Sequence, residues 1–139
     1  MARDSMYVSV EYFRARGRFE DFVVHEAAHV FHNVKCGTVG LRETRTREWL
    51  LDIDFTRRET FAYACEAFSR IRELGGSPAA RRRLVAELEI TTAPAADHLD
   101  VEKYVDILRE AVLVRNGWKR ILERCAPQSV HSRCPRRFR

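Results

Sequence analysis

The sequence predicts an α+β fold that is mostly helical, with a small sheet and additional helices toward the C-terminus. Four runs have the apolar spacing, caps or glycine stops of helices. Two short runs, MYVSVEYF at 6–13 and WLLDIDF at 49–55, are rich in strand-forming residues and partly alternate apolar with polar side chains. We therefore expect two strands among four helices.

The first two expected helices carry the residues of most chemical interest. One covers about 19–34 and ends before Gly37, because glycine commonly terminates a helix. The other covers 56–74 and stops at Gly75-Gly76. Between them, the stretch GTVGLRETRTREW looks like an irregular connection that leads into the second expected strand.

The remaining helices lie in the C-terminal half. Ser77 and Pro78 open one of them, with serine at the cap and proline in the first turn. Residues 91–97 are expected to form a loop, and 100–124 a long amphipathic helix bent at Gly117. The apolar side chains that this long helix is expected to turn inward are Val101, Tyr104, Leu108, Ala111, Trp118 and Leu122.

Length and composition indicate one soluble globular domain. The chain has 139 residues, of which 45% are hydrophobic and 32% charged. We expect a single domain over 1–126 and a basic, flexible tail over 127–139. No window approaches the roughly 18 uninterrupted apolar residues that span a bilayer, and the N-terminus has no secretory signal pattern. The expected location is the cytoplasm, with no membrane contact and with reduced cysteines.

The basic charge does not by itself predict a nucleic-acid partner. The net charge is +5, but most arginines are scattered among acidic residues, as on solvated helix faces. The sequence has no helix-turn-helix, zinc-finger spacing or RNA-binding aromatic signature. We therefore do not expect nucleic acid as a partner.

The run HEAAH at 25–29 is the strongest chemical signal in the chain. On a helix, His25 and His29 are one turn apart and can present two imidazoles to one metal ion. Glu26 lies about 100° round the helix from His25, where a carboxylate can reach a water on the metal without binding the metal itself. From 22 to 34, Glu26 is the only charged side chain in an otherwise largely apolar helix. A bound cation would explain an acid in such a place.

A third metal ligand is expected from the second helix, where two glutamates compete. Glu59 and Glu66 are seven residues apart and share nearly one face. Glu59 could instead complete a capping box with Thr56, and Glu66 could pair with Arg70 one turn on. Yet Glu66 is surrounded by apolar neighbours in the sequence, which is unusual for a surface acid. The residues alone leave this choice open.

HEAAH, followed by a helix containing Glu59-Thr60-Phe61-Ala62, resembles the gluzincin branch of the zincin metallopeptidases in a minimal form. The Glu-x-Phe-Ala segment is similar to the glutamate helix of anthrax lethal factor-like peptidase domains. The likeness covers about residues 20–72. It implies Zn²⁺ held by His25, His29 and Glu59, with Glu26 as general base.

The resemblance also implies a reaction and a substrate. The expected function is zinc-dependent hydrolysis of a peptide or protein substrate. Many gluzincins place an acid one turn after the ligand glutamate, whereas this chain has Tyr63, which could donate a hydrogen bond to the developing oxyanion. Only 24 residues precede His25, which is enough for one strand and a turn.

The alternative is a non-catalytic metal-binding or pseudo-enzyme module. It would bind a protein partner or a second copy through its amphipathic helices and basic tail.

Overall fold

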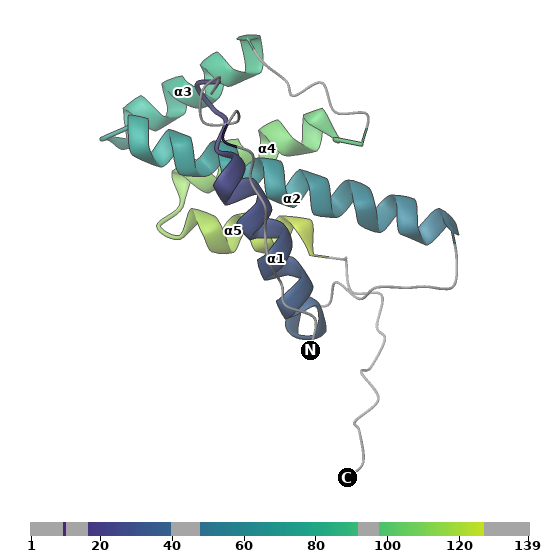
Figure 1. Cartoon of the computed structure of the whole chain (residues 1–139). Coiled ribbons are helices and arrows are strands. Elements are labelled where there is room, and N and C mark those ends of the chain that lie inside the picture. Colours follow the sequence, from purple (N-terminus) through teal and green to yellow (C-terminus); the bar gives the residue numbers. More distant parts are fainter. Residues whose placement is uncertain (1–9, 11–16, 40–47, 92–97, 127–139) are drawn as a thin grey trace.

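The computed structural model describes residues 10, 17–39, 48–91 and 98–126, and these residues form helices and the short links between them (Figure 1). In chain order the helices are α1 (Phe22–Val39), α2 (Glu48–Leu74), α3 (Pro78–Thr91), α4 (Val101–Leu113) and α5 (Gly117–Cys125).

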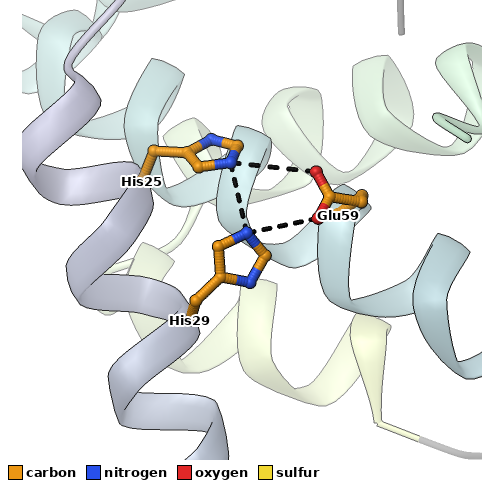
Figure 2. Close-up of side chains that lie close together, drawn as sticks. All are labelled: His25, His29 and Glu59. Carbon is orange, nitrogen blue, oxygen red and sulfur yellow. Dashed lines mark hydrogen bonds and ion pairs between the residues drawn. The ribbon is translucent and has the colours of Figure 1, made fainter. Parts of the chain in front are cut away.

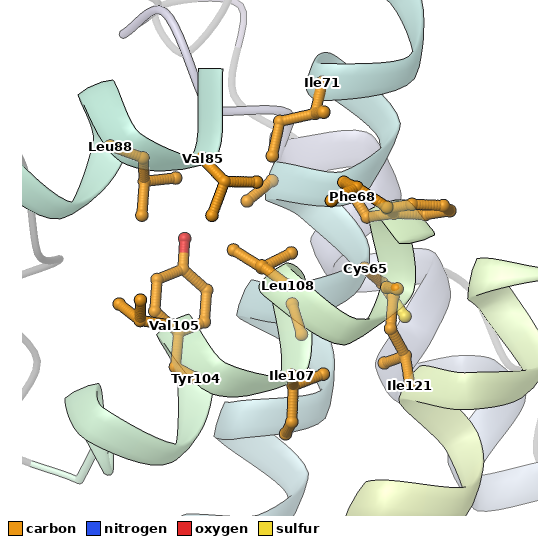
Figure 3. Packing of buried hydrophobic residues seen from close by; sticks show 14 of the residues in the cluster. Cys65, Phe68, Ile71, Val85, Leu88, Tyr104, Val105, Ile107, Leu108 and Ile121 are labelled. Atoms are coloured by element: carbon orange, nitrogen blue, oxygen red, sulfur yellow. The ribbon is translucent and has the colours of Figure 1, made fainter. Parts of the chain in front are cut away.

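Helix α2 is the centre of the fold and packs against each of the other four helices. In Figure 1, α1 crosses α2 near the middle of α2. The inner face of α2 is buried against α4 and α5, where Phe68 and Ile71 meet Leu108 and Ile121 (Figure 3). Each of these four side chains is at most 2% exposed, so this face of α2 is closely packed against α4 and α5.

Local signals fix where the later helices begin. The Ser77 hydroxyl accepts a hydrogen bond from the Ala80 amide at 3.1 Å, and Pro78 is the first residue of α3. The Asp100 carboxylate accepts from the Lys103 amide at 3.0 Å at the start of α4.

Helix α5 begins at a cap and approaches α2 closely. The Asn116 side chain accepts a hydrogen bond from the Lys119 amide at 3.0 Å. Gly117 follows, and a Cβ atom there would lie 2.2 Å from the Phe68 ring of α2. Only a glycine permits this approach between the two helices.

The predicted α+β class is wrong, because the described residues contain no strand and no sheet. The run 49–55, expected as a strand, lies inside the 27-residue helix α2. Seven residues are too few for alternation to distinguish a strand from a helix. No glycine or proline separates this run from the helix after it, so that helix extends backward at low cost. The other expected strand, 6–13, lies outside the described residues except for Val10, which has 3₁₀-helical backbone.

Two helix boundaries also differ from expectation. Helix α1 continues through Gly37 to Val39, because one glycine lowers helix stability by only about 1 kcal/mol. The single helix expected over 100–124 is instead two helices, α4 and α5, separated at 114–116. Asn116 begins a new helix by capping it, so the chain breaks ahead of Gly117 and does not bend there.

Several apolar side chains are more exposed than the sequence indicates. Val101 is 38% exposed and Trp118 45%, although both were expected to point inward. Helix α1 is not buried all round either, since Val23 and Phe31 are 39% and 43% exposed. Its sequence is apolar on both sides, but within 22–31 the buried side chains, His25 and Ala28, share one side of the helix.

Two cysteines lie in the core, and both are free thiols. Burial raises the pKa of Cys125 to about 11 and raises the pKa of Cys65 further. None of the helices in the described part of the chain has the length and apolar character needed to cross a membrane. The tail expected over 127–139 lies outside the described residues.

Candidate metal centre

The N-terminal turn of α1 fixes the direction of the first histidine. The Asp21 carboxylate accepts a hydrogen bond from the Val24 amide at 3.3 Å, and the Asp21 carbonyl accepts from the His25 amide at 2.9 Å. This cap sets the helical register from which His25 and His29 point toward α2. His25 is buried and His29 half-buried.

Helix α2 faces the two histidines with three side chains, Glu59, Tyr63 and Glu66. These residues are four and three positions apart in the sequence. This spacing places all three on one side of the helix. The alternative in which Glu59 completes a capping box with Thr56 is wrong. Helix α2 begins at Glu48, so Thr56 lies well inside it and not at its start. Glu59 is therefore free of any capping role.

His25, His29 and Glu59 converge on one small space (Figure 2). The two imidazole Nε2 atoms are 3.2 Å apart. Glu59 Oε1 lies 3.2 Å from His29 Nε2, and Glu59 Oε2 lies 3.8 Å from His25 Nε2. Ligand atoms bound tetrahedrally to zinc at about 2.0–2.1 Å are roughly 3.3–3.4 Å from one another. The spacing of these donors thus fits one small cation between them.

Glu66 meets His25 on the other side of the imidazole ring. Its Oε2 is 3.1 Å from His25 Nδ1, and its Oε1 accepts the Asp21 amide at 2.7 Å. A carboxylate only accepts hydrogen bonds, so Nδ1 carries the proton and the neutral ring presents its lone pair at Nε2. Glu66 is therefore placed to orient the His25 imidazole, as carboxylates commonly do for histidines that bind metals.

The alternative pairing of Glu66 with Arg70 does not occur. Glu66 is only 6% exposed, and Arg70 pairs with Glu73 and donates to the Arg18 carbonyl. Glu59, not Glu66, faces the Nε2 atoms. The sequence did contain a signal for Glu66, namely an acid among apolar neighbours, but its role in orienting His25 was not anticipated.

The charges around the two imidazoles shift their pKa values in opposite directions. Burial lowers the pKa of His25, but the hydrogen bond and charge of Glu66, together with the charges of Glu59 and Glu26, outweigh it and raise the pKa overall. Burial dominates for His29 and lowers its pKa, against the opposing charge of Glu59. Without a metal, the first proton therefore belongs to His25, next to Glu66.

The two predicted catalytic residues, Glu26 and Tyr63, lie beside these histidines. Glu26 is half-buried, and its negative charge acts on both imidazoles. The Tyr63 ring meets His25 edge-on, with their centroids 4.5 Å apart. Burial and the charges of Glu59, Glu66 and Glu20 raise the pKa of Tyr63, so its hydroxyl stays protonated and able to donate near neutral pH.

Comparison with known proteins yields no match: no family model, no curated protein and no solved structure is similar to this chain. The assignment of a function therefore depends on the residues of the site.

Proposed function

We propose that this protein is a zinc-dependent hydrolase that cleaves amide or peptide bonds. One observation carries the proposal: ligand atoms of two imidazoles and one carboxylate lie within 4.8 Å of one another, while Glu66 holds the Nδ1 atom of His25. The three ligands among the described residues leave a fourth position on a tetrahedral zinc ion, which is the arrangement of catalytic and not of structural zinc.

The donor set suits zinc better than other common cations. Two imidazoles and one carboxylate are the ligands of several catalytic zinc sites. Magnesium and calcium prefer sites made of oxygen ligands alone. Zinc bound here would polarise a substrate carbonyl and lower the pKa of a bound water to about 7.

The roles of the protein groups follow from their positions. Glu26 neighbours both imidazoles without sharing their ligand space, so its carboxylate takes a proton from the attacking water and returns it to the leaving nitrogen. The Tyr63 hydroxyl, which remains protonated beside His25, donates a hydrogen bond to the negative charge that develops on the substrate oxygen. Glu66 keeps His25 in the tautomer that binds metal.

Metal content is the first experiment. Protein purified without added metal is analysed by mass spectrometry, together with His25→Ala and Glu59→Ala. We expect about one zinc per chain in the native protein and a loss of zinc in both variants. His98→Ala is the matched control, because His98 is exposed on the link before α4 and is not part of the cluster. A native protein that takes up no zinc, even when zinc is added, would overturn the proposal.

A non-catalytic metal-binding module remains the second candidate, and one observation favours it. The described residues contain no strand whose edge could hold an extended peptide. Hydrolysis separates the two candidates. Zinc-loaded protein that cleaves no member of a broad peptide library would support the binding module, whereas cleavage that is lost in Glu26→Gln would support the hydrolase.

A further inference from the structure

An apolar groove lies on α2 between α1 and α5. It has a volume of about 440 Å³ and is lined by residues of all three helices. Helices α1 and α5 each pack against α2. The buried side chains of Phe61 and Cys65, which belong to α2, form the floor between them. His25, His29 and Glu59 are not part of the lining, so the groove is separate from the candidate metal centre. We call it the α1–α5 groove.

Two large apolar side chains of the groove are left partly open to solvent. Phe31 of α1 is 43% exposed and Trp118 of α5 is 45% exposed, and both line the groove. Each ring nevertheless rests on a buried partner. Phe31 stacks on Phe61 with 6.3 Å between ring centroids, and Trp118 meets Phe68 edge-on at 4.8 Å. The groove is therefore preformed, and exposed apolar surface in a concave site is typical of ligand binding.

One edge of the groove is positively charged. Lys119 is the only charged residue among the described residues that line it, and Asn116 lies at the same edge. Lys119 and Arg120 both pair with Glu123, at 3.8 and 3.9 Å. One carboxylate balances only one of these two cations, so a positive charge remains at this edge. The pair of Lys119 with Glu123 is long and exposed to solvent, so Lys119 can exchange that partner for a ligand at little cost.

We propose that the α1–α5 groove binds an amphipathic anion with a single alkyl chain and a carboxylate head. The chain lies over Phe61 and Cys65, between the rings of Phe31 and Trp118, and the carboxylate pairs with Lys119. The volume of the groove lies within the range of about 300–1,000 Å³ that small-molecule sites occupy. This site goes beyond the proposed hydrolysis, and binding in it requires no zinc.

The binding test compares decanoate with decyltrimethylammonium, which has a chain of the same length and the opposite charge. Each is titrated into the full-length protein below its micellar concentration, and calorimetry gives the stoichiometry and the Kd. We expect one decanoate per chain and binding of the cation at least about tenfold weaker. Octanoate and hexanoate should bind progressively more weakly, by up to about fourfold for each methylene removed. Equal affinity for the two head groups, or an affinity independent of chain length, would overturn the proposal.

Matched variants locate the two ends of the ligand. Lys119→Met removes the charge and keeps an apolar stem, and it should weaken decanoate binding about tenfold. Lys103→Met is its control, because Lys103 lies on α4 outside the lining. Ala27→Leu adds volume to an exposed position of the groove wall and should also weaken binding about tenfold. Its control is Ala79→Leu, at an exposed position of α3. Equal effects of either variant and its control would overturn the proposal.

A second copy of the chain is the other occupant that the experiment has to separate. Sedimentation velocity of the native protein and Ala27→Leu, each with and without decanoate, makes the distinction. A monomer under all four conditions, together with one decanoate bound per native chain, would support the ligand. A native dimer that dissociates in Ala27→Leu would assign the groove to a second copy and overturn the ligand.

Discussion

Glu66 Oε2 lies 3.1 Å from His25 Nδ1, while Glu59 approaches the same imidazole from the Nε2 side. The two glutamates of α2 thus lie at opposite nitrogens of one histidine ring. Glu59 lies 3.8 Å from Nε2, the nitrogen proposed to bind metal, and Glu66 accepts a hydrogen bond from Nδ1. Glu66 also accepts the Asp21 amide at the start of α1, so it couples the ring orientation to the position of the helix.

Substitution of Glu66 should weaken zinc binding without changing its stoichiometry. In Glu66→Gln the amide oxygen still accepts from Nδ1, but the negative charge is lost. Loss of a carboxylate partner of a ligating histidine costs about 10- to 100-fold in metal affinity. Competition with a chromogenic chelator measures the Kd. Glu102→Gln, on the exposed first turn of α4, is the control. An unchanged zinc affinity in Glu66→Gln would contradict the orienting role.

Glu26→Gln should abolish turnover and keep the metal. The carboxylate is the proposed proton acceptor, and general bases contribute about 10²–10⁴-fold to rate. Zinc content by mass spectrometry and kcat on a cleaved library peptide are measured on the same preparation. Full activity in this variant would show that the proton goes elsewhere.

Tyr63→Phe tests the proposed hydrogen bond to the oxyanion. The phenylalanine ring keeps the edge-on contact with His25, seen at 4.5 Å between centroids, and removes only the hydroxyl. Loss of one oxyanion donor lowers kcat by about a hundredfold. Zinc affinity and KM should change little. A KM effect alone would instead assign Tyr63 to substrate binding.

Gly117→Ala should destabilise the fold, because the new Cβ would lie 2.2 Å from Phe68 Cζ and 2.6 Å from the Ala111 carbonyl oxygen. Helix α5 would have to move away from α2, at a cost of about 1–3 kcal/mol in the free energy of unfolding. Urea denaturation measures the change. Gly76→Ala is the control, because a Cβ atom at Gly76 would have no neighbouring atom within 4 Å. Equal midpoints for the two variants would contradict the close approach of α5.

The Cys125 thiol predicts a loss of stability at alkaline pH. Burial raises its folded-state pKa from 9.0 to about 11, so the folded protein holds the thiol proton more tightly than the unfolded chain. The resulting stabilisation is fully present below pH 9 and is lost as the pH rises through 11. At pH 10 the loss is about 1.4 kcal/mol. Urea unfolding of the native protein and Cys125→Ala at pH 8 and 10 measures it, and parallel pH dependence in both would contradict it.

Part of the fold and of the candidate site followed from the sequence. The caps at Ser77-Pro78 and the stop at Gly75 are local signals, and the structure confirms a helix boundary at each. The strand expected over 49–55 was wrong because a short alternating run depends on its neighbours, and here it continues a helix. The bend expected at Gly117 was wrong because Asn116 starts a new helix ahead of it.

By itself, the sequence determined that His25 and His29 share one face of a helix with Glu26 beside them, because helical periodicity is local. It also limited the third ligand to Glu59 or Glu66. Only the tertiary structure shows which of the two faces the Nε2 atoms, since this depends on how far along α2 the α1 helix lies. At the observed crossing, Glu59 meets the Nε2 atoms and Glu66 meets Nδ1. Tyr104 of α4 comes close to Glu66 of α2 in the same way, through packing that no local pattern encodes.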